Sequence, residues 1–470
     1  MIDIVQGGSL RRWNISLSLR VEFCRRMASW EKTPEVILGK IFSFLSTLDK
    51  VKVFHTCSSW RKALEQASAW QQFQYSEGRI WDEIFETGIP SSLDDLEQYE
   101  VVHQSILECL ERFGRYMKNI SIAIRSTSSF EVYQKIVHNC FNVRNFSLIS
   151  MCAEFSEMEI LKCTMHEFLQ RNNQIRKLEI ENIDNSGVKN APLPIGLKHS
   201  SHLHSLWIVN SFSSSLLSNL MYLMNLSELA LTPHQLNFSL LKHLASLSLR
   251  DLHIVANSKT RGFYNEAISD AQWGEIRRHG PKLRVHCFLA KSHEWTEKEV
   301  FLKPSMPLTS LVYRKNVWIK YLESVCTLMT YHSKTLTTFM DFSLVHRPYN
   351  YPTPLCYEDR VDRHMIRLSR LCPRLQTLSI KEALSSAAIL LMVYHNKNLT
   401  DLLVRHDMIL YVNDLPDELL DDLVVKDFIE DNYERDNFEN AVSSMLGTEW
   451  HTLEVSEFFE IMDLKYSKFS

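Results

Sequence analysis

Apolar residues recur at helical spacing in a short stretch near the N-terminus. Thr33 and Pro34 suit the start of one helix, and Asp49 suits the start of a second. The apolar positions that follow these starts are Ile37, Ile41, Phe44 or Leu45, and Leu48, then Val53, Cys57, Trp60 and Leu64. A unit this small cannot bury so many large side chains by itself. The pattern therefore predicts a surface that docks on a partner.

A second pattern, apolar-x-x-apolar-x-apolar, repeats from about residue 115 onwards. Most copies start 23 to 32 residues apart, close to the period of roughly 20–29 residues of leucine-rich repeats. Two spacings of 39 residues, after Leu244 and after Leu336, require an insertion or a missed copy; residues 256–272 are a candidate insertion. The copies start at Met117, Val143, Ile175, Leu203, Leu226, Leu244, Leu308, Leu375 and Leu399, with weaker ones at Leu283, Leu336 and Trp450.

The segments between the copies have helical patterns, so each unit is expected to be a helix followed by a strand. The boundary where a helix should end and the next strand begin is marked at three places by Cys372-Pro373, Asn172-Asn173 and Asn396-Lys397-Asn398. Each unit exposes an apolar edge that only a stacked neighbour covers, which predicts one continuous curved core. The alternative is a doubly wound sheet, which is disfavoured because no strand run is long and no glycine-rich turn follows one.

The stretch 33–60 resembles the F-box, the module by which substrate receptors of cullin-based ubiquitin ligases bind the Skp adaptor. Trp70 fits the tryptophan that often closes this module. Thr33 and Lys50 stand where the family usually has leucine, and both weaken the apolar seam. The residues in register with the family pattern are Pro34, Ile37, Leu38, Ile41, Phe42, Ser43, Phe44, Leu45, Asp49, Cys57 and Trp60.

The resemblance implies an adaptor-binding surface and an assembly. The adaptor would join the chain to a cullin, and the repeats, which resemble the cysteine- or asparagine-bearing repeats often fused to F-boxes, would hold a protein target. A helical hairpin that packs only on its own chain is the alternative. The residues expected to form or support the adaptor surface are Pro34, Ile37, Leu38, Ile41, Phe42, Leu45, Leu48 and Trp60.

The expected fold class is α/β, with an N-terminal three-helix F-box followed by an irregular leucine-rich-repeat α/β solenoid. Residues 1–28 form a basic extension expected to be poorly ordered, 29–75 the F-box, 76–115 a helical linker, and 116–470 the solenoid. The basic extension is either a transit peptide or a stretch of little structural value preceding a start at Met27.

Three surfaces of the solenoid are candidates for target binding. The strand face ranks first, because a curved repeat surface offers the area that a stable interface requires. A loop rich in proline and tyrosine ranks second, with Tyr349, Tyr351 and Tyr357 as aromatic anchors, although such a loop is equally expected to pack down as a connector. The acidic run 414–440 ranks third, as a solvated face or as a contact for a basic surface.

Composition gives no case for nucleic acid or membrane as a partner. The net charge is −4, and no apolar run approaches the eighteen or so residues of a membrane span. The N-terminus lacks the pattern of a secretory signal. Ten scattered cysteines without a Cys-x-x-Cys pair indicate reduced thiols, hence the cytoplasm or nucleus.

The chain contains no recognisable catalytic motif for phosphate binding, dinucleotide binding or nucleophilic attack. His202 and His204 could share a strand face, but no carboxylate or cysteine accompanies them at ligand spacing, so no metal, cofactor or catalytic residue is expected. The expected function is the substrate-recognition subunit of a Skp–cullin–F-box ubiquitin ligase, which acts by proximity. A non-catalytic scaffold not coupled to a ligase is the alternative, and an enzyme with a site outside these motifs is a third class.

Overall fold

The structure is a computed structural model in which two compact units are distinguished, Met1–Asn145 and Phe146–Ser470. The residues described are 33–84, 93–150, 155–181, 195, 199–210, 219–256, 268–289, 302–313, 330–341, 356–420 and 422–466. The N-terminal extension predicted at 1–28 lies outside these residues.

The N-terminal unit begins with three short helices in the stretch predicted to be an F-box. The first helix begins one residue later than expected, with Pro34 as its N-cap. The second is capped by Ser46, whose Oγ accepts the Asp49 amide at 3.1 Å, so the prediction of Asp49 as the cap was wrong. The elements are α2 (Glu35–Phe42), α3 (Thr47–Phe54), α4 (Ser58–Leu64), η1 (Ala67–Trp70), β1 (Gln72–Ser76), α5 (Glu77–Ile84), α6 (Leu93–Phe113), η2 (Gly114–Tyr116), β2 (Asn119–Ile124) and α7 (Thr127–Asn139).

The second unit alternates helices and short strands, and strand β3 (Asn145–Ser150) lies across the boundary between the units. Its first half contains α8 (Phe155–Arg171), β4 (Lys177–Glu181), β5 (Ser205–Val209), β6 (Glu228–Leu231), η5 (Pro233–Gln235), α9 (Phe238–Leu247), β7 (Asp251–Ala256), α10 (Asp270–His279), β8 (Arg284–Leu289) and β9 (Leu308–Tyr313).

The rest of this unit carries the remaining repeats and a helical C-terminal part. Its elements are β10 (Thr338–Asp341), η6 (Tyr357–Asp359), α13 (Asp362–Leu371), β11 (Thr377–Ile380), β12 (Leu384–Ser385), α14 (Ser386–His395), β13 (Asp401–Val404), η7 (His406–Met408), β14 (Ile409–Leu410), η8 (Asp417–Leu419), α15 (Leu423–Asn432), α16 (Arg435–Leu446) and α17 (Val455–Tyr466).

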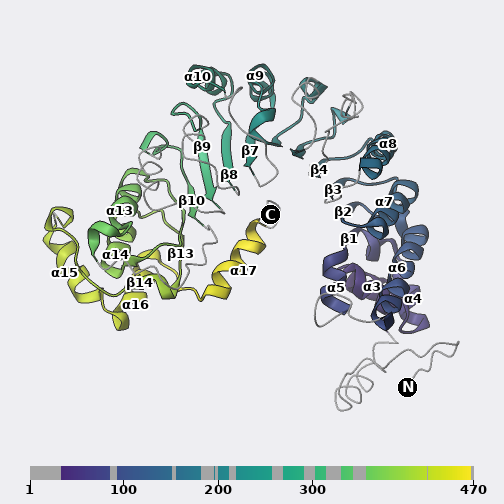
Figure 1. Ribbon diagram of the computed structural model, residues 1–470, viewed down its shortest axis with the longest axis horizontal. Coiled ribbons are helices and arrows are strands. Elements are labelled where there is room, and N and C mark those ends of the chain that lie inside the picture. The colour runs from purple at the N-terminus through teal and green to yellow at the C-terminus, as the bar shows by residue number, and fades with distance from the viewer. Residues whose placement is uncertain are drawn as a thin grey trace, which may run out of the picture. The chain divides into compact units, whose positions relative to one another are not determined.

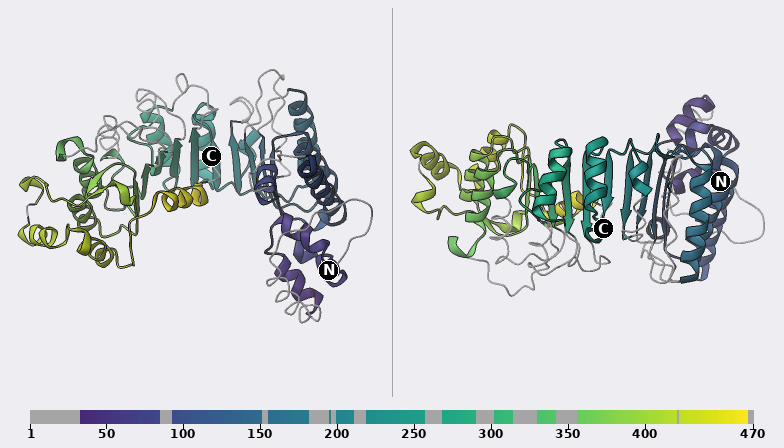
Figure 2. Two further views of the ribbon diagram at one scale, coloured as in Figure 1. Left: turned by 60° about the horizontal axis from the view of Figure 1, so that its bottom comes forward. Right: turned by 90° about the horizontal axis from the view of Figure 1, so that it is seen from above.

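The strands are parallel and follow one another in chain order, which confirms the α/β repeat fold. Strands β4 to β11 and then β13 succeed each other in the second unit, and β12 pairs with β14 in a separate small sheet. Figure 1 shows α9, α10 and α13 on the outer side of these strands, and Figure 2 shows the strands side by side. A doubly wound sheet reverses its strand order, so that alternative is excluded.

Side chains along each strand point alternately to the two faces of the sheet, and one of these faces forms the core. Leu206 and Ile208 of β5, and Leu252 and Ile254 of β7, are fully buried. Because side chains alternate along a strand, these residues share one face, and the residues between them share the other. Neighbouring repeats thereby form one continuous core, as the repeat pattern predicts.

The repeat pattern placed one strand incorrectly and missed three, which are β1 and the two-residue strands β12 and β14. The copy starting at Leu244 is wrong, because Leu244 and Leu247 belong to helix α9. The strand itself follows Leu249, with Leu252 and Ile254 in the same spacing. Strand β1, within the stretch expected to be F-box, was not foreseen. The weak copy at Trp450 contributes only a single parallel bridge, between Leu453 and Arg405.

The asparagine and cysteine residues predicted at the boundaries between helix and strand lie where the helices end. Cys372 and Asn396 are the C-caps of α13 and α14, and both are buried. The Asn396 side chain donates from Nδ2 to the Cys372 carbonyl at 3.3 Å and accepts the Asn398 amide at 3.2 Å. It thus adds a second donor to the Cys372 carbonyl, which also accepts the Leu375 amide at 3.0 Å, and ties the end of α14 to the end of α13.

Burial also determines the state of several thiols. It raises the pKa of Cys109, Cys140 and Cys372 to about 12. These side chains stay protonated and fill the core as small apolar groups. Among the helices that the structure describes, none combines the length and hydrophobicity needed to cross a membrane.

The acidic run at 414–440 folds into a helical layer next to the last repeats. Helix α14 is apolar on all sides, with Ala387 to Val393 buried, and such a helix requires cover on every face. Helices α15 and α16 pack against it, through buried side chains such as Ile429 and Phe438. This layer closes the repeat array in the manner of a capping element.

The hydrogen bonds at the end of α14 predict that Asn396 and Asn398 contribute differently to the free energy of unfolding. Asn396→Ala should lower the free energy of unfolding by about 1–3 kcal/mol, because it removes the two hydrogen bonds that the buried Asn396 side chain makes. Asn398→Ala is the matched control, since Asn398 is exposed although it also donates to a carbonyl, that of Pro373. It should cost no more than about 0.5 kcal/mol. Urea unfolding of both variants measures the two values, and equal losses would contradict the role of Asn396.

Candidate adaptor-binding and target-binding surfaces

Helix α2 exposes a set of large apolar side chains to solvent. Val36 is 69% exposed, Ile37 52%, Ile41 38% and Phe44, just after the helix, 84%. We call these four residues the docking face. Surfaces of this kind, gathered on one short element, are typical of interaction sites.

The opposite side of α2 fixes the helix to its own unit. Leu38 and Phe42 are buried, and the Phe42 ring meets Trp60 edge-on with centroids 5.5 Å apart. At Gly39, a Cβ atom would lie 2.9 Å from the Cβ of Gln66, so only glycine allows α2 to pack this closely against Gln66. The docking face is thus carried by a firmly packed helix.

The eight residues predicted to bind the adaptor fall into three groups. Pro34, Ile37 and Ile41 are exposed, Leu45 and Trp60 are half-buried, and Leu38, Phe42 and Leu48 are buried. The buried residues can only support the surface from beneath. Val36 and Phe44 were left out of the predicted set, although both lie within the motif; the missing signal was which side of α2 packs inward.

A shallow groove adjoins the docking face. Its volume is about 340 Å³, and its walls come from α2 and from the η1 region. The groove gives a partner side chain a place to insert beside Phe44. Its lining residues are Val36, Lys40, Ser43, Phe44, Ser68, Gln71 and Gln72.

Lys50 does not weaken the docking face, contrary to the expectation from its place in the motif. The side chain points into the N-terminal unit, where it is 1% exposed. Its Nζ donates to the Gln72 carbonyl at 3.2 Å and lies 5.8 Å from the centre of the Trp70 ring. Burial lowers the pKa of Lys50 from 10.5 to about 8.

The strand face of the second unit, the first-ranked target surface, carries a ladder of rings. Trp207, Ala230, His253 and His286 occupy matching positions on β5, β6, β7 and β8. Because Ala230 is small, Trp207 and His253 approach to 4.8 Å between ring centres across it, and His253 and His286 stack at 4.7 Å.

Two carboxylates hold the histidines of this ladder. His253 Nε2 lies 3.3 Å from Glu228, and His286 Nε2 lies 3.2 Å from Asp251, which also binds Arg284 at 2.7 Å. Burial acts to raise the pKa of both carboxyls, but hydrogen bonds, chiefly from His253 to Glu228 and from His286 to Asp251, lower each to about 2. Both carboxylates are therefore ionised. The carboxylates and the two histidine rings are partly exposed, whereas Trp207 is buried.

The other two target candidates fare differently. Tyr349 and Tyr351 lie outside the described residues, and Tyr357 is buried, which leaves little of its ring for a partner. In the acidic run, Asp414 is paired with the buried Arg360, and Asp417 lies 3.0 Å from Lys426. Leu423 and Val424 at the start of α15 are largely exposed.

Two curated proteins resemble this chain over a large part of their sequence. F-box/LRR-repeat protein 21 of Mus musculus is 21% identical over 306 residues, and that of Bos taurus 20% over 309 residues. Each match covers 62% of this chain and 66% of the relative. The chain therefore matches just under two thirds of these relatives, and the matches support a protein of the F-box/LRR type.

Among solved structures, the complex of Rad7 and Elc1 in yeast contains a chain that aligns with 85% of this one. The alignment covers 95% of that chain at 12% identity, with a TM-score of 0.41. No protein-family model matches the sequence.

The burial of Lys50 predicts how stability depends on pH. The folded protein releases this proton near pH 8 and the unfolded chain near pH 10.5, so between these values the unfolded state binds more protons and stability rises with pH. Lys50→Met removes the buried charge. It should stabilise the N-terminal unit at pH 7 and do so less at pH 10.

Urea unfolding at both pH values, followed by hydrogen exchange of peptides from α3 and β1, measures this difference. Lys52→Met is the matched control, because Lys52 lies exposed on the same helix, and its effect should not change in this way. A stabilisation by Lys50→Met that is equal at pH 7 and pH 10 would show that the charge of Lys50 is not the cause.

Proposed function

We propose that this protein is the substrate-recognition subunit of a Skp–cullin–F-box ubiquitin ligase. The docking face on α2 binds the Skp adaptor, the adaptor binds a cullin, and the repeat unit holds a protein target in the cytoplasm or nucleus. The observation that carries the proposal is the exposure of Val36, Ile37, Ile41 and Phe44 within the stretch that matches the F-box pattern.

The energetic argument concerns these exposed side chains. Burying a large aliphatic or aromatic side chain contributes roughly 1.5–3 kcal/mol. Four such groups, three on α2 and Phe44 just after it, are enough to anchor an interface, because a few central residues supply most of its binding energy. Ile37 and Ile41 lie one helical turn apart, so a single apolar groove of a partner can cover both.

The role proposed for the chain requires no catalytic group of its own. Ubiquitin is transferred from the thioester of the conjugating enzyme, and the receptor contributes by holding the target near it, which removes the entropic cost of their encounter. The partly exposed part of the ring ladder, His253 and His286 with their carboxylate partners, is the proposed contact surface for the target.

A scaffold that binds partners without feeding a ligase is the competing function. Thr33 and Lys50, which replace the leucines of the family pattern, are the sequence features that favour it. Since the Lys50 side chain is turned inward, only Thr33 remains as a sequence feature that favours the scaffold function.

A pair of substitutions on the docking face tests the proposal in cells. Ile37→Ala with Ile41→Ala should weaken adaptor binding by roughly three orders of magnitude, because hot-spot truncations cost about 2 kcal/mol or more each. Neither side chain is buried, so the thermal stability should change little. The full-length variant should lose adaptor and cullin on affinity purification yet retain its targets.

Leu96→Ala with Val101→Ala is the matched control, since these α6 side chains are similarly exposed at 51% and 57%. Mass spectrometry should find proteins that accumulate with the α2 variant, and with inhibitors of the proteasome or of cullin activation, but not with the control. Undiminished adaptor binding by the α2 variant would overturn the docking site. Loss of the adaptor without accumulation of any bound protein would favour the scaffold.

A further inference from the structure

An apolar row crosses the strand face of the second unit, on the side away from α9 and α10. Val255, Phe288, Val312 and Met340 stand at matching positions on β7, β8, β9 and β10. All four are at most 3% exposed and belong to one buried cluster with Val209. We call Val209, Val255, Phe288, Val312 and Met340 the inner row. On β5, β7 and β8, the strands that carry both, it lies two residues along the strand from the ring ladder.

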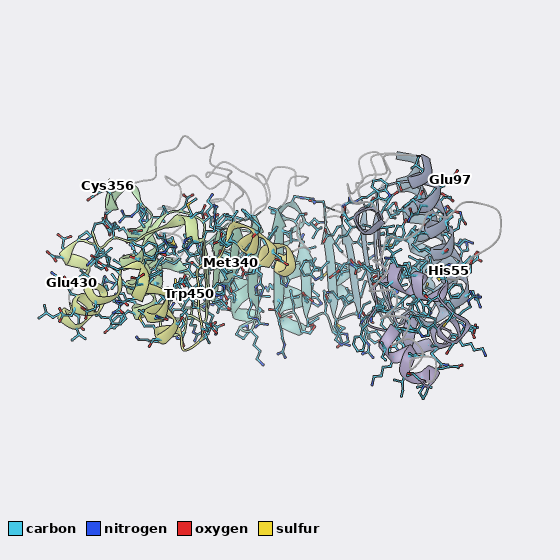
Figure 3. The ribbon with its side chains drawn as sticks, turned by 90° about the horizontal axis from the view of Figure 1, so that it is seen from below. His55, Glu97, Met340, Cys356, Glu430 and Trp450 are labelled. Atoms are coloured by element: carbon cyan, nitrogen blue, oxygen red, sulfur yellow. The ribbon has the colours of Figure 1, made fainter. Side chains whose placement is uncertain are left out.

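The C-terminal helix of the chain contributes to the cover of this row. Phe458 of α17 belongs to the same cluster, and Phe459 and Ile461 pack against it. Figure 1 shows α17 on the inner side of the strands, and Figure 3, in which Met340 is labelled, shows the helix lying over the strands at that point. An amphipathic helix therefore fits the inner row.

The chain is fixed to the sheet immediately before this helix. The Leu453 amide donates to the Val404 carbonyl at 2.9 Å, and the Leu453 carbonyl accepts the His406 amide at 2.9 Å. The Trp450 indole donates to the Leu402 carbonyl at 2.7 Å. Helix α17 begins two residues after Leu453, so these bonds tether its start to strand β13 independently of its contacts with the row.

The described part of α17 is attached less extensively than the strands beneath it. From Val455 to Ile461 only Phe458 is fully buried, and Val455, Ser456, Glu457 and Glu460 are exposed. Glu457 accepts the amide of Glu454, a bond local to the start of the helix. Strands β7 to β9 are instead held by backbone pairing on both edges. Elements with few buried apolar contacts open at lower free energy than the core.

The geometry points to the inner row as a docking groove for an amphipathic helix of the target, with α17 as a tethered competitor. The target helix carries large apolar residues three positions apart, as Phe458 and Ile461 do, and takes the place of α17 on the row. The inference builds on the proposed function, since it names the class of target segment that the repeat unit receives. Helix binding in an apolar groove is a known mode of peptide recognition.

A labelled peptide with the sequence of residues 453–466 is the probe, and fluorescence anisotropy measures its binding. The full chain should bind it weakly, because α17 already lies on the row. The full-length variant Phe458→Ala with Ile461→Ala should bind it at least tenfold more tightly. The same peptide carrying Phe458→Ala and Ile461→Ala should bind neither protein. Leu423→Ala with Val424→Ala, on exposed side chains of α15, is the matched control and should behave as the wild type.

Hydrogen exchange of the wild-type chain gives a measurement that needs no substitution. Peptides from α17 should exchange faster than peptides from β7 to β9, and added probe should protect the latter in the loosened variant. Equal peptide affinity for wild type and variant, or exchange of α17 only together with the strands, would overturn the proposal and make α17 a fixed part of the core. No adaptor is present in these assays, so a negative result would not affect the proposal that the docking face on α2 binds the adaptor. Conversely, the peptide assays can be interpreted even if the adaptor does not bind.

Discussion

The structure depends on one constraint, which is that no repeat can bury its own apolar strand face. Leu252 and Ile254 of β7 lie between the corresponding residues of β6 and β8, and all of them are buried. Each strand is therefore stabilised by its neighbours in sequence, and the array grows in chain order. Because this core occupies one face of the sheet, the other face is left to be covered by other elements, such as α17 over the inner row, or by a partner. The ring ladder and the inner row both lie on that second face.

The N-terminal unit solves the opposite problem. Its helices are too short to enclose all of their apolar residues, so α2 buries Leu38 and Phe42 while leaving Ile37 and Ile41 in solvent. The same unit tolerates a lysine in its core, since the Lys50 ammonium reaches the Gln72 carbonyl along a flexible stem. An exposed apolar helix and a buried cation both lower the stability of a domain that stands alone. They suit a domain that completes its surface with a partner.

Local periodicity predicted much of this fold because helices and strands place apolar residues at different intervals. It located two N-terminal helices, the second of which is divided into α3 and α4 in the structure, and most of the strands of the repeats. It failed at Leu244, where a leucine-rich helix runs into a strand and both Leu244 and Leu249 begin an acceptable copy. It could not place α17 on the inner row, because Phe458 and Phe288 belong to one buried cluster although they lie far apart in the sequence. Nor could it foresee that Lys50 and Tyr357 turn inward, since burial of a single side chain leaves no periodic trace.

The central claim is that the exposed face of α2 is an adaptor-binding surface, and hydrogen exchange with purified Skp adaptor tests it most directly. The peptide that spans residues 35–45 of the full-length chain should become protected when the adaptor is added. Peptides that contain Leu96 and Val101 on α6, which are equally apolar and exposed, should exchange at unchanged rates. Binding without protection of residues 35–45, or no binding at micromolar adaptor concentrations, would contradict the account.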